Sequence, residues 1–296
     1  MRRAHPERAL EKTFAESVGA APGEILLAAV SGGADSTALA ALLARHAEKS
    51  GATVVLGHVN HATRPSAGRD EGVVLALAAG LGVRAVVRAL EPGRASEARL
   101  RALRYAQLAD IARSVGATSI LTAHHAEDQT ETVLLALFRG TGPAGLAGIP
   151  RLRRLGDGLK LVRPLLETTH ARLLAYCRSS RLPYALDPSN DDLAYRRNAL
   201  RAALGQLRAT FPGLDAAVAR STAIARDEAE GAERAALRRR LREELSGATG
   251  QVREMTYERL DSLARAVQRG GSGRHFVRPG LEVKTPFCFA KRGPQG

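Results

Sequence analysis

Apolar runs alternate with amphipathic stretches along the first half of the chain. Continuous apolar runs predict buried β-strands at 24–30, 52–59, 84–90 and 118–124. Apolar positions with helical spacing predict helices at 36–49, 67–80, 96–115 and 127–139. Apolar strands separated by helices are typical of a parallel sheet that is covered on both faces. The pattern therefore predicts a doubly wound, mostly parallel α/β fold, in which ligands bind beyond the carboxyl ends of the strands.

The pattern changes in the second half. The predicted elements are two short strands within 151–166 around a Gly-Asp-Gly turn, helices at 168–180, about 192–245 and 256–268, and two strands near 274–289. Phe211–Gly213 interrupts the longest helical stretch. We therefore predict an α/β domain at 1–212 and a smaller, mainly helical domain at 213–296 that ends in a strand pair.

The charge balance favours a polyanionic partner. The 44 basic residues outnumber the 30 acidic ones, which gives a formal net charge of +14. Nearly all of the basic residues are arginine, which stays charged and binds phosphate through two parallel hydrogen bonds. The Ala- and Leu-rich composition indicates that a GC-rich genome explains the choice of arginine over lysine. The net charge itself points to nucleic acid or nucleotide.

Cysteine usage and hydropathy exclude several classes of protein. Cys177 and Cys288 form no CxxC pair, which argues against a disulfide framework, a zinc ribbon and a cysteine-held iron–sulfur cluster. No apolar run is long enough to span a bilayer, and the N-terminal stretch lacks the apolar segment of a signal peptide. We therefore expect a soluble cytoplasmic protein with no membrane partner.

The segment "SGGADS" follows the first strand. Ser31, Gly32 and Gly33 form its turn, and Asp35 and Ser36 begin the next helix. Glycines let the backbone approach a ligand, and the free N–H groups of a helix start attract anions. A Walker loop would add a lysine, whereas an aspartate makes sense if a divalent cation such as Mg²⁺ lies between it and phosphate. The loop is therefore predicted to bind Mg-pyrophosphate or the triphosphate of ATP, while the alternative is a capped glycine turn.

This segment resembles the SGGxDS signature of the PP-loop ATP pyrophosphatases. Those enzymes split ATP between the α and β phosphates and transfer AMP to an oxygen. The resemblance implies that ATP and Mg²⁺ are used here, with Ser31, Gly32, Gly33, Asp35 and Ser36 at the pyrophosphate and Asp35 at the metal.

Two segments beyond the loop resemble tRNA(Ile)-lysidine synthetases within that superfamily. "HVNHATRPSAGRDE" at 58–71 brings His58 and Asn60 to the end of the second strand, where they contact a nucleotide or cap the strand. "EARLRALRY" at 97–105 resembles the family's ARxxRY element and places Arg101 and Arg104 on one helix face. In the family these arginines face ATP phosphate or tRNA, so we expect Arg101 at ATP and Arg104 in catalysis. The alternative is a solvated helix with an ion pair.

The segment 121–150 carries the most information. Two histidines end a strand, and Asp128 and Glu131 follow on one face of a helix. Such carboxylates can hold an ammonium group or magnesium, and a histidine can stabilise charge or move a proton, although acidic helix capping is the alternative. This segment resembles the corresponding segment of the tRNA(Ile)-lysidine synthetases, including the motifs RGTG and GLAGIP. That resemblance implies that Asp128 and Glu131 bind lysine, that His124 lies near the reacting phosphate, and that Arg139 contacts phosphate or RNA.

The segment 163–201 extends the resemblance through its Arg-Pro-Leu-Leu opening, the turn at Asp187–Asn190 and the YxRNxLR ending. Arg197 and Arg201 are four residues apart on one helix face, where we expect them to face the RNA backbone. Residues 213–296 resemble the accessory domain of the family less closely.

The resemblance implies the following activity. The enzyme would convert the wobble cytidine of isoleucine tRNA with a CAU anticodon to lysidine, using ATP and free L-lysine, and would release AMP and pyrophosphate. A homodimer is also implied. Two alternatives remain, a 2-thiocytidine synthetase, which usually needs cysteine clusters, and an RNA-binding protein with a vestigial nucleotide site.

Overall fold

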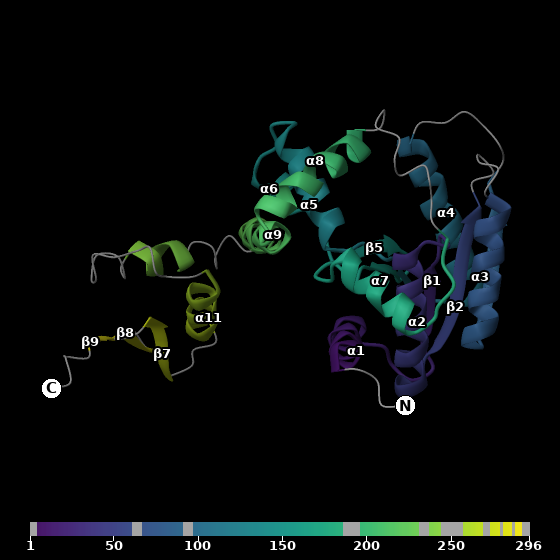
Figure 1. Cartoon of the computed structure of the whole chain (residues 1–296). Helices are drawn as coiled ribbons and strands as arrows, with labels where there is room; N and C mark the ends of the chain where they lie inside the picture. The colour runs from purple at the N-terminus through teal and green to yellow at the C-terminus, as the bar shows by residue number, and fades with distance from the viewer. Residues whose placement is uncertain are drawn as a thin grey trace. The chain divides into compact units, whose positions relative to one another are not determined.

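The chain folds into two compact units. This computed structural model describes residues 5–60, 67–90, 97–185, 196–230, 237–243, 257–268, 273–278, 281–285 and 288–291 (Figure 1). The first unit comprises Met1–Leu135 and Ile149–Ala219, and the second comprises Ala136–Gly148 and Arg220–Gly296.

Within the described residues, a six-stranded sheet with the order β3-β2-β1-β4-β6-β5 forms the centre of the first unit. Its strands are β1 (Ile25–Ala29), β2 (Thr53–Asn60), β3 (Arg84–Ala89), β4 (Ser119–Leu121), β5 (Leu152–Gly156) and β6 (Leu159–Val162). All neighbouring pairs are parallel except β5 and β6. The predicted mostly parallel sheet is therefore confirmed.

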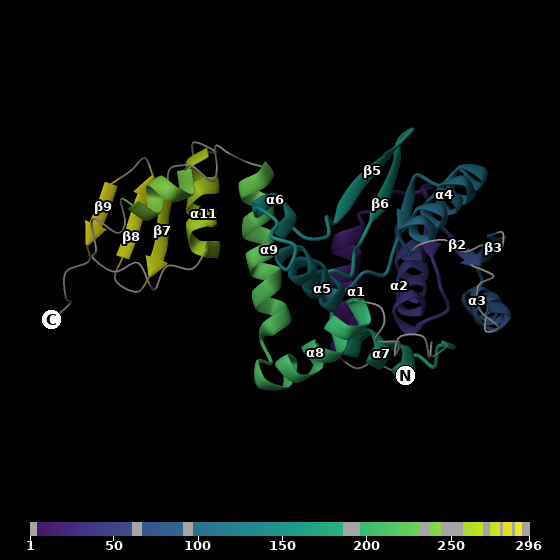
Figure 2. The ribbon, with the colours of Figure 1, turned by 90° about the horizontal axis from the view of Figure 1, so that it is seen from above.

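Helices cover both faces of this sheet, as Figure 2 shows for α2 and α4. The helices of the first layer are α1 (His5–Val18), α2 (Ala34–Ser50), α3 (Ala67–Leu81) and α7 (His170–Ser179), and the opposite face carries α4 (Glu97–Val115). Leu26 and Ala28 of β1 pack into the core of the first layer, whereas Leu27 between them packs into the core with α4. The alternation of side chains along a strand therefore buries both faces of β1.

The order of the strands reverses next to β1. The chain runs from β1 outward through β2 to β3, and then returns to place β4 on the other side of β1. Ligands of such sheets bind outside the carboxyl ends of the two strands that flank the reversal. The residues after Ala29 and after Leu121 therefore mark the expected binding crevice.

The edge of the sheet is the predicted hairpin. β5 and β6 pair antiparallel around Gly156, Asp157 and Gly158, all with positive φ values of 92°, 48° and 76°. Glycine adopts this conformation without strain, and aspartate tolerates it better than most residues do. The Gly-Asp-Gly turn that the sequence predicts is thus confirmed.

The remaining helices are α5 (Ala126–Leu137), α6 (Pro143–Leu146), α8 (Arg196–Thr210), α9 (Leu214–Glu230) and α11 (Tyr257–Gln268). The break at Phe211–Gly213 is confirmed, because it separates α8 from α9. The compact units, however, divide within α9, between Ala219 and Arg220, and the second unit also takes in Ala136–Gly148. The predicted domain boundary after residue 212 stays a prediction.

The second unit contains a small sheet of β7 (Gly273–Arg278), β8 (Leu281–Thr285) and β9 (Cys288–Lys291). The predicted strand pair was wrong in number, because the described residues form three antiparallel strands. Four buried residues, Leu241, Leu260, Leu263 and Ala264, form a separate apolar core in this unit. Among the described helices, none combines the length and apolar character needed to span a membrane.

Candidate active site

The segment between β1 and α2 forms a tight loop held by its own hydroxyls. The Ser31 N–H donates to Ser36 Oγ at 3.1 Å, and that hydroxyl donates to the Gly33 carbonyl at 3.0 Å. Gly32 has a φ of +95°, and a Cβ placed there would lie 3.3 Å from the Asp70 carbonyl oxygen. A side chain at Gly32 would therefore be both strained and crowded.

The start of α2 is open to an anion. Gly33 is the N-cap and supplies no side-chain acceptor for the first N–H groups of the helix. A Cβ at Gly33 would meet only Ser31 Oγ, at 3.8 Å, so the backbone here is accessible to a ligand. Unpaired helix N–H groups together with the helix dipole attract negative charge.

The end of β4 brings acidic residues to the same crevice through the first turn of α5. The His125 N–H donates to Asp128 Oδ2 at 3.0 Å, which caps the helix. The His125 ring contacts Glu127 Oε2 through Nδ1 at 2.9 Å. Glu127 also accepts the His170 N–H with both carboxylate oxygens at 3.0 Å, which joins the start of α7 to the start of α5.

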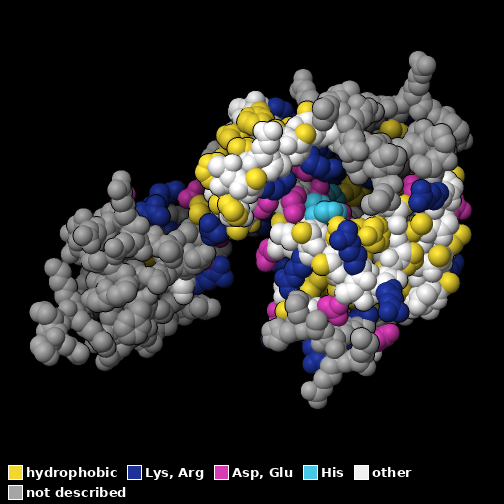
Figure 3. Space-filling view, viewed as in Figure 1, with side chains coloured by type: hydrophobic (Ala, Val, Ile, Leu, Met, Phe, Trp, Pro, Cys, Tyr) yellow, Lys and Arg dark blue, Asp and Glu magenta, His cyan; other side chains and the backbone are white. Residues whose placement is uncertain are grey.

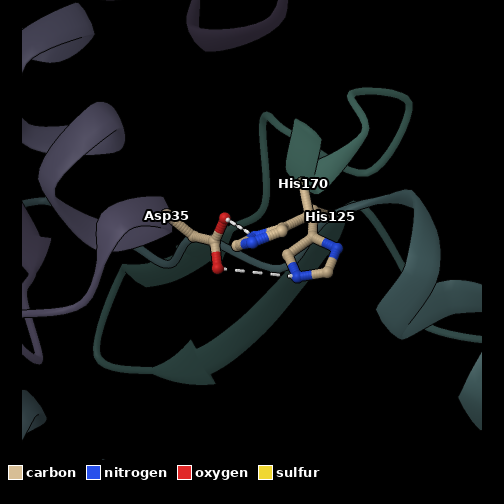
Figure 4. Close-up of side chains that lie close together, drawn as sticks. All are labelled: Asp35, His125 and His170. Carbon is tan, nitrogen blue, oxygen red and sulfur yellow. Dashed lines mark hydrogen bonds and ion pairs between the residues drawn. The ribbon is translucent and has the colours of Figure 1, made fainter. Parts of the chain in front are cut away.

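Asp35 lies at the centre of a cluster with two histidines (Figure 4). Its Oδ1 is 2.7 Å from His170 Nδ1, and its Oδ2 is 3.7 Å from His125 Nε2. His125 is buried, whereas the side chain of His170 is 48% exposed. We call Asp35, His125 and His170 the histidine cluster.

The carboxylates around this cluster change the protonation of its histidines. Burial alone would lower the pKa of His125, but the hydrogen bond with Glu127 and the charges of Asp128 and Asp35 raise it above its usual value. The hydrogen bond with Asp35 raises the pKa of His170 against the effect of burial. The surrounding carboxylates therefore favour the protonated form of both histidines.

A second cluster pairs carboxylates with arginines. Glu131 is fully buried and accepts from Arg197 Nε at 2.6 Å and from Arg201 Nε at 2.8 Å. Arg201 Nη2 adds a contact to Glu131 at 3.1 Å, and Arg197 Nη2 donates to Asp128 Oδ1 at 3.0 Å. We call Asp128, Glu131, Arg197 and Arg201 the arginine cluster. Its two negative and two positive charges balance.

The two clusters meet at Asp128. Its Oδ1 bonds Arg197, and its Oδ2 lies 3.4 Å from His125 Nε2. Burial would raise the pKa of Asp128, but the charges of His125 and Arg197 lower it. On the face drawn in Figure 3, histidine side chains are visible on the first unit with acidic and basic side chains around them.

Comparison with known proteins identifies the family of this chain. The sequence profile of the PP-loop domain matches residues 4–208, which is more than half of the chain. This chain belongs to the PP-loop domain family.

Several proteins with similar sequences share one name. A protein named tRNA(Ile)-lysidine synthase from Gloeobacter violaceus is 42% identical over 211 residues, which cover 71% of this chain and 65% of the relative. Proteins of the same name from Methylobacterium nodulans and Bradyrhizobium diazoefficiens are 44% and 39% identical, over 67% and 77% of this chain and over 58% and 65% of their own lengths. The matches thus span less than two thirds of these relatives.

A solved structure confirms the fold. A U34-tRNA thiolase, NcsA, from Methanococcus maripaludis superposes with a TM-score of 0.63 at 14% identity, over 73% of this chain and 77% of that chain. At this identity the similarity concerns the fold alone. The SGGADS segment lies between β1 and α2, inside the region that the PP-loop profile matches, and we call it the PP-loop.

His124 faces a different environment from His125. Its Nδ1 is 2.9 Å from Thr122 Oγ1. Burial lowers the pKa of His124 to about 4. The positive charges of Arg163 and Arg101 lower it further, whereas the negative charge of Asp128 raises it. His124 is therefore neutral near pH 7.

His58 and Asn60, which are predicted to contact a nucleotide, contact other residues of the protein in this structure. His58 is buried, and its Nδ1 lies 2.8 Å from the Val30 carbonyl oxygen, beside the PP-loop. Its Nε2 has no partner among the described atoms. Asn60 donates to Glu71 at 3.2 Å. These contacts hold the ends of β1 and β2, and the nucleotide role of both residues stays a prediction.

The predicted arginines fall in three places. Arg101 lies over the Tyr105 ring at 5.5 Å on α4, and Arg104 is exposed on the same helix. Arg139 is exposed and belongs to the second unit, so its predicted role stays untested. Arg197 and Arg201 were expected to face RNA, but in this structure their guanidinium groups bond the carboxylates of α5. The turn at 187–190 lies outside the described residues.

Sequence reasoning missed three residues of the site, His170, Glu127 and Arg163. His170 begins a helix to which the sequence assigns no site residue, and Glu127 adjoins Asp128 in the same helix turn. Arg163 is 4% exposed, donates to the Pro150 carbonyl at 2.6 Å, and has an Nε without a partner among the described atoms. The sequence did offer a signal for Arg163, because this arginine follows a predicted strand and begins the Arg-Pro-Leu-Leu motif.

Proposed function

We propose that this protein converts the wobble cytidine of isoleucine tRNA with a CAU anticodon to lysidine. One observation carries the proposal. The PP-loop and the carboxylates of α5 lie together at the carboxyl ends of β1 and β4, where the strand order reverses. The proteins named tRNA(Ile)-lysidine synthase that match this region support the choice among PP-loop activities. The net charge of +14 suits a tRNA substrate.

The reaction has two balanced steps. Cytosine O2 attacks the α-phosphorus of ATP, the bond to the β-phosphate breaks, and pyrophosphate leaves. The ε-amine of lysine then attacks C2, the C2–O2 bond breaks, and AMP leaves with that oxygen while the amine loses its proton. Adenylation therefore makes a poor leaving group into a good one.

The PP-loop fits the pyrophosphate end of ATP. The uncapped start of α2 and the accessible backbone at Gly33 offer N–H donors to phosphate oxygens. Donors fixed in position before reaction stabilise charge on the departing pyrophosphate without reorganisation. Ser31 and Ser36 hold the loop in this shape through their shared hydrogen bonds.

A magnesium ion fits beside the same loop. Mg²⁺ usually takes one or two carboxylates and completes its shell with phosphate oxygens and water. Asp35 presents a carboxylate next to the helix start, and His170 donates to it in this structure. We assign Asp35 to that ion, whose chemistry would be to neutralise phosphate charge.

Lysine would be held by the carboxylates of the arginine cluster. Asp128 and Glu131 are suited to an ammonium group, but in this structure Arg197 bonds both of them and Arg201 bonds Glu131. Adding a cation to a balanced buried cluster is unfavourable unless another cation leaves. We propose that a tRNA phosphate draws at least one arginine away, so that lysine binds after tRNA.

An AMP-release assay tests the activity. The protein is incubated with Mg-ATP and lysine, with isoleucine CAU tRNA, with elongator methionine tRNA, or without RNA. We expect AMP and pyrophosphate with isoleucine tRNA alone. Release without RNA would contradict the proposal, and no release under any condition would favour the RNA-binding alternative.

The proposed order of binding has its own test. Lysine affinity is measured for the protein alone and in the presence of isoleucine CAU tRNA. We expect tRNA to strengthen lysine binding at least about tenfold, in line with typical coupling energies. Equal affinity in both conditions would contradict the exchange of arginines.

A further inference from the structure

The histidine cluster gathers metal-ligating atoms from three separate elements. Asp35 comes from the first turn of α2, His125 precedes α5, and His170 begins α7. In the described part of the chain, their ligating atoms all lie within 4.8 Å of one another. Figure 4 shows both rings directed at the Asp35 carboxylate.

The spacing of these atoms is close to that of a coordination shell. Bonds of about 2.1 Å arranged tetrahedrally place neighbouring ligand atoms about 3.4 Å apart. Asp35 Oδ1 lies 2.7 Å from His170 Nδ1, and the other carboxylate oxygen, Oδ2, lies 3.7 Å from His125 Nε2, so the two distances fall on either side of that value. Reaching that value takes shifts of about 0.7 Å at His170 and about 0.3 Å at His125. His170 is half exposed, so its side chain has room to move.

Glu127 supplies the supporting contact that histidine ligands need. It lies 2.9 Å from His125 Nδ1, so a proton on Nδ1 leaves the Nε2 lone pair facing Asp35. Its two oxygens also accept the His170 N–H and fix the start of α7. A carboxylate on the second ring nitrogen is the usual means of orienting a metal-bound histidine.

The mixture of donor atoms selects the kind of ion. Two imidazole nitrogens and one carboxylate oxygen suit Zn²⁺ and related transition metals, whereas Mg²⁺ prefers oxygen ligands alone. Asp128 Oδ2, 3.4 Å from His125 Nε2, adds negative charge beside the site. Three protein ligands also leave a fourth position for water or another ligand.

We propose that Asp35, His125 and His170 form a binding site for a divalent transition metal of the Zn²⁺ type. The ion takes the place of the proton that His170 now shares with Asp35, and that proton moves to the far ring nitrogen or to solvent. The site shares Asp35 with the proposed Mg²⁺ position but adds two histidine nitrogens, and it does not rest on lysidine formation. While the transition metal is bound, Asp35 is withdrawn from any other cation.

Direct metal binding tests the proposal. The full-length chain without a histidine tag is treated with a chelator, dialysed and titrated with Zn²⁺, and Co²⁺ is used as a spectroscopic probe of the ligand set. We expect one Zn²⁺ whose affinity falls at least tenfold in His170→Ala. Glu127→Gln, which loses the supporting contact, is expected to bind about 10- to 100-fold more weakly.

Matched controls separate this site from others on the chain. His46→Ala removes a histidine from the same helix, about 16 Å along its axis from Asp35, and is expected to keep the wild-type affinity. Thermal unfolding of each variant confirms folding, and because the side chain of His170 is 48% exposed, its removal should be tolerated. Excess Mg²⁺ is expected to leave Zn²⁺ bound.

Two results would overturn the proposal. One is equal Zn²⁺ affinity in the wild type, His170→Ala and His46→Ala. The other is displacement of Zn²⁺ by Mg²⁺ at similar concentration, because that would show a site built from oxygen ligands alone.

Discussion

The histidine cluster and the arginine cluster lie side by side and hold negative charge in opposite ways. In the first, Asp35 faces two imidazoles that can lose their protons, and the carboxylate is 27% exposed. In the second, Glu131 is fully buried and faces two guanidinium groups that stay charged.

This difference decides what each cluster can exchange. A histidine can give up its proton to make room for a metal ion, so the first cluster is suited to binding cations reversibly. An arginine can leave a carboxylate only if another anion receives it, so the second cluster is suited to responding to phosphate. Asp128, a member of the arginine cluster, connects the two clusters because it contacts both His125 and Arg197.

Replacement of Asp35 should have the largest effect. Asp35→Ala removes the carboxylate that is assigned to the metal at the PP-loop, and we expect AMP release to fall at least about 100-fold. Filter binding should show tRNA affinity nearly unchanged. Asp110→Ala, which removes an exposed carboxylate on α4, serves as the control and should keep full activity. A loss of tRNA affinity as large as the loss of AMP release would contradict the assignment.

Replacement of Glu131 tests the arginine cluster through stability. Glu131→Gln leaves two guanidinium groups facing a buried neutral amide, and we expect a loss of about 3 kcal/mol in the free energy of unfolding. Urea denaturation measures it. Glu167→Gln breaks an exposed pair with Arg151 and should cost less than about 1 kcal/mol. Similar losses in both variants would show that burial of Glu131 contributes nothing.

Asp128 sharpens the comparison because it touches both clusters. Asp128→Ala removes a carboxylate that we propose contacts the lysine ammonium, and we expect the KM for lysine to rise about 10- to 100-fold. The KM for ATP should change much less, because Asp128 is not part of the PP-loop. Steady-state kinetics with either substrate varied measures both constants. Equal increases in the two would contradict the lysine assignment.

The smallest expected effect concerns an arginine–carboxylate pair outside the site. Arg208 donates to Asp215 at 2.8 and 2.9 Å, and Thr130 adds a bond at 2.6 Å. Burial would raise the pKa of Asp215, but the bonds from Arg208 and Thr130 lower it below its usual value.

A carboxyl with a lowered pKa stabilises the folded state above its unfolded pKa, and this contribution is lost as pH falls through the folded value. We therefore expect the difference in stability between wild type and Asp215→Asn to be constant above about pH 5 and to shrink below about pH 4. Urea denaturation across this range measures it. A difference that is the same at pH 3 and pH 7 would rule out ionisation of Asp215 as its source.

Local patterns predicted most elements of the first unit and the loops at which its candidate site residues gather. The strands from β1 to β4, the hairpin around Asp157 and the PP-loop after β1 each follow from residues that are near one another in the sequence. The reversal beside β1 then brings the ends of β1 and β4 together, as is general for such sheets.

The pairing of side chains across the site could not be predicted in the same way. Asp35 and His170 are 135 residues apart, and no periodic signal links them. The spacing of Arg197 and Arg201 predicted a shared helix face but not that Glu131 would be their partner. The third strand of the second unit was also missed, because its four residues are too few to carry a pattern. Helix α1 was missed although it has 14 residues and buries Leu10 and Phe14 at i, i+4 spacing, which was an available signal.

Lysine transfer to tRNA tests the central claim most directly. The protein is incubated with Mg-ATP, labelled lysine and either isoleucine CAU tRNA or elongator methionine tRNA, and the RNA is digested to nucleosides. We predict lysine-bearing cytidine in the isoleucine tRNA alone. AMP release without transfer of label would contradict the claim, because it would leave PP-loop chemistry intact with a nucleophile other than lysine.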